Sequence, residues 1–559
     1  MKKIALILNL MFWAISNLSL AQNSFKQDFE AKSRYLKIPI KNGAKIRNVD
    51  LSINGVKVRW FKVGLAENKP DWYAYLDISD WKGSILTLEV DTLLDQSNAF
   101  KPILQADKDG SDNDYQESLR AQFHFSPKRG WSNDPNGMAY FNGEYHLFFQ
   151  HNPYGTNWGN MHWGHAVSKD LVHWKEFDDA LYPDNDGTMF SGGGVVDNKN
   201  TSGLGNSVNK PLVLFYTAAE KSWEQGLAYS LDGRTFTKLH HTVLPKITDG
   251  NRDPKVIWHE PSNKWVMVLY VTESDDQHTM HFFNSENLID WVFTSKIIGG
   301  KGNDRYLYEC PEFFELAVDG NPNNKKWILT GANSQYAIGT FDGKTFLPEI
   351  ERLYSQVVRD YYAAQTFDNE PKGRRIEIGW WRTHTNKDAS SFNQGMSIPN
   401  EIKLRTTADG LRLVRQPVEE LQILREKRTT VNSSRINSKT PNPLESLKGE
   451  LAEINLNIFP KKAKSIQLNL RGLNIHYDVL SQELEIDKVK ANVPLRNGQL
   501  RFQIFIDRTG VELFANNGEI FMPIDYNLDS NNLNYSLKVE GGEAQLDKVE
   551  FFNLMSIWK

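Results

Sequence analysis

The feature of this 559-residue chain that most constrains its fold is an internal repeat. A short polar turn of related sequence recurs four times, and each copy ends in an aromatic residue, at Trp174, Phe236, Trp291 and Phe346. The period is therefore 55 to 62 residues, which leaves room for several strands in each unit. A strand-built repeat of this length is typical of β-propellers, whose blades are four-stranded sheets around a central channel.

Apolar runs of strand length accompany the turns, and there are five of them. Each is rich in aromatic and β-branched residues, which favour a pleated, half-buried surface. The runs cover residues 145–150, 211–217, 264–271, 326–331 and 374–381. The sequence therefore predicts an all-β chain with a five-bladed β-propeller at its centre.

Three acidic residues stand in unusual contexts between these runs. Asp134 lies in the string Trp-Ser-Asn-Asp-Pro-Asn-Gly, Asp253 in Arg-Asp-Pro and Glu309 in Glu-Cys-Pro. We expect Asp134 on a rigid turn just ahead of a strand-forming run at 138–150. A string so rich in turn formers is also common in plain turns, so the functional interpretation depends on all three acids together.

The spacing between the acids and the apolar runs indicates equivalent positions. Asp134 precedes Leu147 by 13 residues and Asp253 precedes Met267 by 14, and Glu309 stands ahead of the fourth run with a longer hairpin. Because the like ends of innermost strands surround one mouth of a propeller channel, we expect the three acids to meet in one funnel. No metal-ligand spacing of the His-x-x-x-His kind is present, and we expect no metal and no cofactor.

Taken in order, the three acidic strings resemble those of glycoside hydrolase family 32, the fructosidases that include invertases, inulinases and levanases. The resemblance covers about residues 120–559. It implies a retaining mechanism with Asp134 as nucleophile, Glu309 as acid and then base, and Asp253 as a stabiliser of the transition state. Arg252 is expected to keep Asp253 ionised and to bind substrate.

The same resemblance implies further substrate-binding residues. Amides and a hydroxyl would bond sugar hydroxyls, and aromatic side chains would stack on or enclose the ring. These residues are Asn133, Gln150, Trp158, Phe190, Ser191 and Trp380, with Trp163 balanced between a site role and core packing. The chain departs from the family's commonest wording at Ser132, where Met is frequent, and at Phe190-Ser191-Gly192-Gly193, where Trp-Ser-Gly-Ser is frequent.

Three other residues near these motifs have plainer explanations. Cys310 follows Glu309 directly and is expected to be a buried apolar filler, with an influence on Glu309 as the alternative. His151 and His162 lie close to the site in sequence, and we expect structural or rim positions for both.

Length and composition shifts favour several domains. We assign residues 1–21 to a signal peptide, 22–115 to a small N-terminal β domain and linker, 116–415 to the propeller, and 416–559 to a linker helix and a C-terminal β-sandwich. The helix is expected at 418–428. The segment 506–514 resembles part of the family's C-terminal sandwich, and we expect its acids to be structural. The N-terminal domain loosely resembles one found ahead of some bacterial family 32 enzymes.

The first residues predict export to the periplasm or the cell exterior. Two lysines precede an apolar run at 4–20, and Ser19-Leu20-Ala21 fits a cleavage site before Gln22. A retained membrane anchor is the alternative, but the run is short and holds two asparagines. Since Cys310 is the only cysteine, no intrachain disulfide can form.

Charge excludes several partner classes. The net charge is -4, with 65 Lys and Arg against 69 Asp and Glu, so nothing favours nucleic acid or an anionic membrane. A neutral fructan polysaccharide or oligosaccharide is compatible with this balance. Oligomeric state is left open.

Several alternative functions stay open. A related five-bladed enzyme acting on arabinan or xylan would also use three acids, although the Asn-Asp-Pro-Asn-Gly and Glu-Cys-Pro strings argue against it. A fructan-binding protein without catalysis would be favoured if any acid were replaced, and none is. A fructosyltransferase or an endo-levanase of the same family would keep all the motifs. The linkage, β-2,6 levan, β-2,1 inulin or sucrose, is also open, with exo attack favoured.

Overall fold

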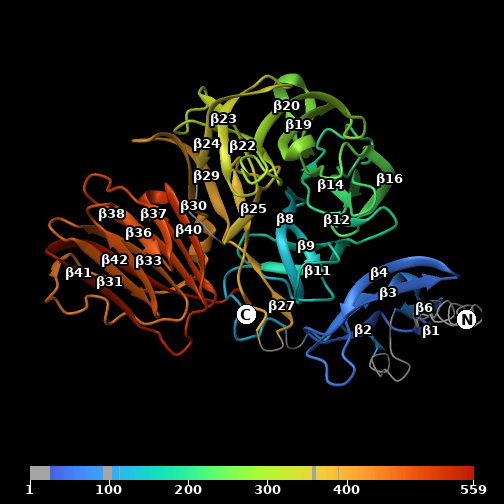
Figure 1. Cartoon of the computed structure of the whole chain (residues 1–559), viewed down its shortest axis with the longest axis horizontal. Helices are drawn as coiled ribbons and strands as arrows, with labels where there is room; N and C mark the ends of the chain where they lie inside the picture. The colour runs from blue at the N-terminus through green and yellow to red at the C-terminus, as the bar shows by residue number, and fades with distance from the viewer. Residues whose placement is uncertain (1–24, 92–102, 112–113, 355–359, 388–389, 559) are drawn as a thin grey trace, which may run out of the picture. The chain divides into compact units, whose positions relative to one another are not determined.

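The computed structural model describes residues 25–91, 103–111, 114–354, 360–387 and 390–558, almost all of the regular structure being β-strand (Figure 1). The predicted signal peptide lies outside these residues. The chain divides into two compact units, Met1–Asp109 and Gly110–Lys559, which are described separately. The all-β prediction is confirmed, and no helix in the described ranges is long and apolar enough to cross a membrane.

The first unit consists of two small antiparallel sheets. One has the order β1 (Phe25–Glu30), β6 (Ile85–Val90), β3 (Ile46–Ile53), β4 (Val56–Gly64), and the other has the order β5 (Trp72–Asp77), β2 (Tyr35–Ile40), β7 (Leu104–Ala106). Alternate residues of the strands are buried, among them Val49, Leu51, Leu86 and Leu88. This period-two burial is what gives each sheet one apolar face.

Five sheets follow one another along the second unit. The first sheet holds β8 (Gly130–Phe141), β9 (Glu144–Asn152), β10 (His162–Ser168) and β11 (Trp174–Leu181), and the second holds β12 (Thr188–Phe190), β13 (Gly194–Val196), β14 (Leu212–Ala219), β15 (Glu224–Ser230) and β16 (Thr237–Leu244). The third holds β17 (Arg252–His259), β18 (Lys264–Glu273), β19 (Gln277–Ser285) and β20 (Val292–Lys301), and the fourth holds β21 (Glu312–Ala317), β22 (Lys325–Thr330), β23 (Gln335–Phe341) and β24 (Phe346–Tyr354). The fifth holds β25 (Tyr361–Thr366), β26 (Ile376–Trp381), β28 (Gly395–Met396), β29 (Asn400–Thr407) and β30 (Gly410–Pro417).

One strand from each of the five sheets takes part in a ring of contacts: β13 of the second sheet and the first strand of each of the others. β8 contacts β13, β13 contacts β17, β17 contacts β21, β21 contacts β25, and β25 contacts β8 again. The short strand β27 (Phe392–Asn393), which follows the second strand of the fifth sheet, pairs in parallel with β8 of the first. This cyclic order is what a five-bladed β-propeller predicts.

The repeated polar turns join the last two strands of each of the first four sheets. In each turn one side-chain oxygen accepts hydrogen bonds from two backbone N–H groups two and three residues ahead. These caps are Asp170, Asp232, Asn287 and Asp342. The repeat seen in the sequence is therefore a repeat of one Asx-type turn.

Two local expectations were wrong. The run 138–150 is not one strand, because β8 ends at Phe141 and a tight turn through Asn142 and Gly143, both with positive φ, leads into β9. The linker helix expected at 418–428 is a short 3-10 helix, η5 (Glu419–Leu424), followed directly by strand β31 (Arg425–Val431), since the chain must enter the next sheet there.

Two packed sheets form the C-terminal sandwich. The larger has the order β31, β42 (Glu543–Leu554), β33 (Ala452–Phe459), β38 (Leu500–Asp507), β39 (Gly510–Ala515), β40 (Ile520–Asp525), with β32 (Ser434–Asn437) on β42. The smaller has the order β37 (Val489–Asn492), β36 (Glu483–Ile486), β35 (Leu473–Asp478), β34 (Ser465–Leu470), β41 (Tyr535–Glu540). One apolar cluster from both sheets forms its core.

A buried charge cluster joins the sandwich to the five-sheet domain. His124, ahead of β8, contacts Asp507 through Nδ1 at 2.8 Å and Glu512 through Nε2 at 3.2 Å, and all three side chains are fully buried. Asp507 also accepts backbone N–H groups of Gln122 and Phe123. The acids of the segment 506–514 are therefore structural, as expected.

We predict that the stabilising contribution of this cluster is lost at alkaline pH. Hydrogen bonds and charge from Asp507 and Glu512 outweigh the burial of His124 and raise its pKa to about 9 from 6.5. Because the pKa of His124 is higher in the folded than in the unfolded state, its interactions stabilise the protein fully below pH 6.5. This contribution to the free energy of unfolding, about 3 kcal/mol at most, is lost as the pH rises to 9. Thermal unfolding of wild type and His124→Gln between pH 6 and 9.5 tests this. The variant should be less stable at pH 6.5 and lose less on raising pH; identical pH profiles would refute the role.

Candidate active site

One cavity of about 250 Å³ collects every residue that the sequence assigned to a site. Its lining comprises Asn133, Asp134, Gln150, Trp158, Phe190, Ser191, Arg252, Asp253, Glu309 and Trp380, together with Cys310 and Tyr362. These residues come from all five sheets or the segments that lead into them. The structure therefore brings the three acids together, as the repeat predicted.

β-Bulges aim two of the acids into the cavity. Between the pairs Ser132–His151 and Pro135–Phe149, β8 has one residue more than β9, and Asp134 lies in that stretch. β17 has the same excess over β18 between Arg252–Tyr270 and Lys255–Val268, where Asp253 lies with φ 63°. A bulge leaves its extra residue out of the ladder and redirects its side chain. Asp134 thus lies within a strand rather than on the turn expected ahead of one.

Glu309 reaches the same place by a different backbone route. It stands three residues before β21, and both Glu309 and Cys310 have positive φ, 37° and 41°. This region is unfavourable for residues with a Cβ and is commonly found where surrounding structure holds a functional site.

Two side chains donate hydrogen bonds to the Glu309 carboxylate, one to each oxygen. Arg252 donates to Oε2 from Nη2 at 2.6 Å and from Nε at 3.1 Å, while the Tyr362 hydroxyl donates to Oε1. Arg252 is itself fixed by the Gly250 carbonyl at 2.9 Å. The carboxylate is therefore oriented before any ligand arrives.

Asp134, which is partly exposed, and Asp253, which is buried, have separate hydrogen-bond donors. Ser191 Oγ donates to Asp134 Oδ2 at 2.7 Å, and the Cys310 backbone N–H donates to Asp253 Oδ2 at 3.0 Å. Burial raises the pKa of Asp134, whereas Ser191 and Asn133 act to lower it. The Cys310 thiol lies 3.7 Å from Asp134 Oδ2 and 3.5 Å from Asp253 Oδ2, so it separates the two acids.

Arg252 favours the ionised form of Asp253, as expected, but its closer contacts are with Glu309. Its Nε lies 3.6 Å from Asp253 Oδ2, whereas its Nη2 lies 2.6 Å from Glu309. Burial raises the pKa of Asp253 to about 7, a change that Arg252 opposes and Glu309 reinforces. The guanidinium is shared between two carboxylates, and Glu309 takes the closer contacts.

Aromatic side chains form the walls of the cavity. Trp158 is 53% exposed and meets Phe190 edge-on, so its ring is available to a ligand. Trp380 donates from Nε1 to Gln394 at 3.0 Å and packs edge-on against Tyr362 and Trp131. Flat apolar rings beside polar groups suit the mixed faces of a sugar ring.

Other residues near the motifs lie outside the cavity lining. Trp163 is fully buried and donates to the Phe190 carbonyl at 3.1 Å, so core packing explains it. His151 is buried between Asp179 and the Arg129 carbonyl, and His162 is also buried. These three side chains are therefore buried and do not line the cavity.

Tyr362 is the site residue that the sequence analysis missed. It pairs with Trp380 just before a third bulge, in which β25 has one residue more than β26 ahead of the pair Gln365–Ile378. Tyr362 therefore occupies the place that Arg252 occupies in β17, and both contact Glu309.

Three carboxylates, one shared cation and aromatic walls suit acid–base and nucleophilic chemistry on a neutral, hydroxyl-rich ligand. Among the described residues, no group of three or more His, Cys, Asp or Glu side chains could hold a metal ion.

Comparison with known proteins identifies one family. The model described as "Glycosyl hydrolases family 32 N-terminal domain" matches residues 124–417, and that described as "Glycosyl hydrolases family 32 C terminal" matches residues 420–553. A levanase of Bacillus subtilis is 37% identical over 494 residues, which is 79% of this chain and 72% of the levanase. An extracellular exo-inulinase of Aspergillus ficuum is 31% identical, over 79% of this chain and 96% of the inulinase.

Solved structures give the same result. An exo-inulinase from Aspergillus awamori superposes with TM-score 0.70 at 29% identity, covering 79% of this chain and all of that one. A β-fructofuranosidase from Schwanniomyces occidentalis, complexed with fructosyl-erythritol, gives TM-score 0.68 at 26% identity, over 79% and 99%. Residues 1–123 lie ahead of both family models.

We predict that Cys310 resists alkylation in the folded protein. Burial, followed by the charges of Asp253 and Asp134, raises the pKa of its thiol well above 9. The thiolate is the reactive form, so iodoacetamide at pH 8 should leave the native protein unlabelled and label one site after denaturation, as measured by mass spectrometry. Rapid labelling of native protein would show that the thiol is not enclosed as described.

Proposed function

The chain belongs to glycoside hydrolase family 32, and we propose that it is an exported, retaining β-fructosidase that releases fructose from β-fructans. The observation that carries the proposal is the convergence of Asp134, Asp253 and Glu309 in one aromatic-walled cavity. The relatives named levanase and exo-inulinase support a fructan substrate.

In the first step Asp134 attacks the anomeric C2 of a fructosyl unit. Its Oδ2 is held by Ser191, which leaves Oδ1 as the attacking atom, and its burial strengthens charge interactions inside the cavity. The C2–O bond to the leaving group breaks as a covalent fructosyl-enzyme forms. A second inversion at C2 then returns the original configuration.

Glu309 moves the proton in both steps. It protonates the leaving oxygen, then removes a proton from the water that hydrolyses the fructosyl-enzyme. Tyr362 and Arg252 donate hydrogen bonds to Glu309, and these bonds stabilise the carboxylate that remains after the leaving group has been protonated.

Asp253 and the remaining lining residues bind the sugar. Asp253 accepts from ring hydroxyls in the transition state, while Asn133 and Arg252 supply donors. Gln150 donates from Nε2 to the Met189 carbonyl at 2.8 Å, so its Oε1 serves as an acceptor for a sugar hydroxyl. Trp158, Phe190 and Trp380 enclose the ring.

The cavity supports attack on chain ends. Its volume of about 250 Å³ lies below the roughly 300–1,000 Å³ common for small-molecule sites, which favours one buried fructosyl unit over a threaded polymer. Free fructose is then the product. Levan and inulin are both substrates under this proposal, and sucrose is a weaker one.

Two variants of the same chemistry compete with hydrolysis from the chain end. An endo-levanase would release oligosaccharides, and a fructosyltransferase would pass the fructosyl group to a sugar instead of water. Product analysis on levan, inulin and sucrose separates these outcomes. A fructan-binding protein without catalysis is disfavoured because all three acids are present.

We propose that the protein is exported from the cytoplasm. The start of the chain, two lysines, an apolar run and Ser19-Leu20-Ala21, has the pattern of a cleaved signal peptide. Relatives that carry "extracellular" in their names support it. N-terminal sequencing of protein recovered from outside the cytoplasm tests this, with Gln22 as the expected first residue.

We predict that Asp134→Asn and Glu309→Gln each lower turnover on fructan by about 10³-fold or more, because each removes a group that bonds with or protonates the reacting atoms. Both replacements are isosteric, so circular dichroism and thermal unfolding should match wild type. Asp179→Asn, in the shell behind the cavity, is the matched control and should keep turnover within severalfold. Substantial turnover in folded Asp134→Asn would refute the assignment.

We predict a smaller loss for Tyr362→Phe. The variant keeps the ring and removes one donor to Glu309, so kcat should fall about 10- to 100-fold with KM little changed. A kcat equal to that of the wild type would assign Tyr362 to the cavity wall alone.

We predict that the fructose first released has the β configuration of the substrate. Two inversions through Asp134 require it. NMR spectra recorded faster than mutarotation provide the test. α-Fructofuranose as the initial product would refute the retaining mechanism, whereas oligosaccharides without monomer would keep the mechanism and make the enzyme endo-acting.

A further inference from the structure

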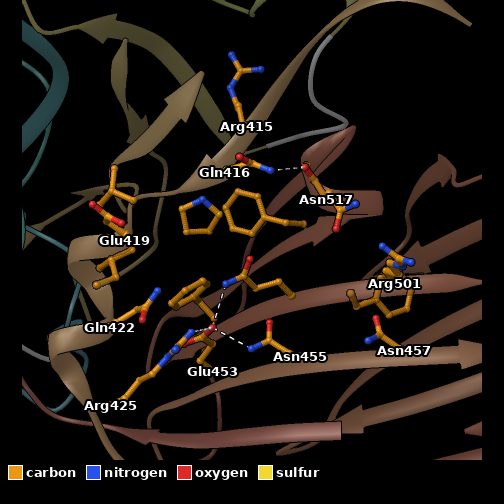
Figure 2. A pocket seen from close by; sticks show the side chains of 18 residues that line it. Arg415, Gln416, Glu419, Gln422, Arg425, Glu453, Asn455, Asn457, Arg501 and Asn517 are labelled. Atoms are coloured by element: carbon orange, nitrogen blue, oxygen red, sulfur yellow. Dashed lines mark hydrogen bonds and ion pairs between the residues drawn. The ribbon is translucent and has the colours of Figure 1, made fainter. Parts of the chain in front are cut away.

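A second cavity, of about 430 Å³, lies beside the C-terminal sandwich and shares no lining residue with the candidate active site (Figure 2). The end of β30, the 3-10 helix η5 and the outer face of β33 and β38 line it. We call it the sandwich cavity. Its volume falls within the range of about 300–1,000 Å³ usual for small-molecule sites.

Side-chain alternation places a row of amides on the face that lines the sandwich cavity. In β33 the core side holds Ile454, Leu456 and Ile458, so Asn455 and Asn457 face outward. Their direct partners on β38 are Gln503 and Arg501. Neighbouring pairs on one face of a sheet lie close enough to contact one ligand together.

A buried carboxylate fixes how the amides point. Glu453, 1% exposed, accepts two hydrogen bonds of 2.7 Å from Arg425, one of 3.1 Å from Asn455 Nδ2 and one of 2.9 Å from Gln503 Nε2. Figure 2 shows Arg425 and Asn455 converging on Glu453. Because a carboxylate only accepts, both amides must turn their N–H₂ groups toward it. Asn455 Oδ1 and Gln503 Oε1 are then held as acceptors for hydroxyl donors.

Further polar capacity surrounds these acceptors. Within the described part of the chain, the side chains of Asn457 and Gln422 make no hydrogen bond. Phe505 and Phe514 also line the cavity, but each is only 2% exposed, so the accessible lining is mainly polar. A lining of amides matches a ligand that is rich in hydroxyl groups.

The charges of the sandwich cavity are mostly paired among themselves. Arg425 is neutralised by Glu453, and Arg415 donates to Glu377 at 2.6 and 3.0 Å. Arg501 stands near the rim, with Nε bound to Gln499, and Glu419 is exposed. No surplus of one sign favours a charged ligand, so a neutral one fits best.

We propose that the sandwich cavity is a second sugar-binding site, which holds a neutral β-fructan segment through the Asn455, Asn457 and Gln503 amides. The fructan part of this statement rests on the proposed function; the neutral, polyhydroxylated ligand rests on the cavity alone. The site retains the polymer on the protein surface while chain ends are hydrolysed elsewhere.

The test uses full-length Asp134→Asn protein, so that fructan is not consumed. Native gels that contain levan or inulin should retard it, and replacing Asn455, Asn457 and Gln503 together by Ala should raise the dissociation constant about tenfold. Glu453 and Arg425 are left intact, so their ion pair still holds the fold. Asn469→Ala/Asn474→Ala, an amide pair on the opposite sheet, is the matched control and should be retarded like the parent.

The same three replacements in the active protein complete the test. The kcat/KM on polymer should fall several-fold while that on a trisaccharide stays unchanged. Retardation equal to that of the Asp134→Asn parent overturns the site, and equal retardation in dextran overturns its fructan ligand. If the wild-type chain fails to hydrolyse any fructan, the proposed function fails, and loss of retardation in the variant still identifies the sandwich cavity as a sugar site.

Discussion

Closure of the ring of sheets is the constraint on which the site depends. β27 pairs with β8, so the last sheet is joined to the first, and one strand from each sheet lies in a ring of contacts. A closed ring brings Asp134, Asp253 and Glu309 within reach of one ligand, although they lie on three different sheets or the segments that lead into them. Bulges turn Asp134 and Asp253 inward at a cost in ladder hydrogen bonds.

Much of this architecture could be predicted from the sequence. The five apolar runs are the second strands of the first, third, fourth and fifth sheets and β14 of the second, and the recurrent turns fall between the last two strands of the first four sheets. Both signals are local, since side-chain alternation and Asx capping depend on neighbouring residues. The acids could be found because residues at nearly the same distance from the apolar runs of different repeats are expected at equivalent positions in the fold.

What the sequence did not predict depends on pairing between distant segments. A bulge is a mismatch of two strands, so neither strand alone reveals that Asp134 or Tyr362 lies beside one. The role of Arg252 follows from the backbone at Glu309, whose positive φ no local pattern indicates. β27 is two residues long, too short for any periodicity to mark it.

The position of β27 also sets an order of events during synthesis. Residues 392–393 must leave the ribosome before the sheet that begins at Gly130 gains its last partner, and Asp507 must follow before His124 gains its own. Until then most of the domain exists as unclosed sheets with unpaired edges. The carboxylates therefore assemble only late, when nearly the whole chain is present, so the site is incomplete while most of the chain is being synthesised.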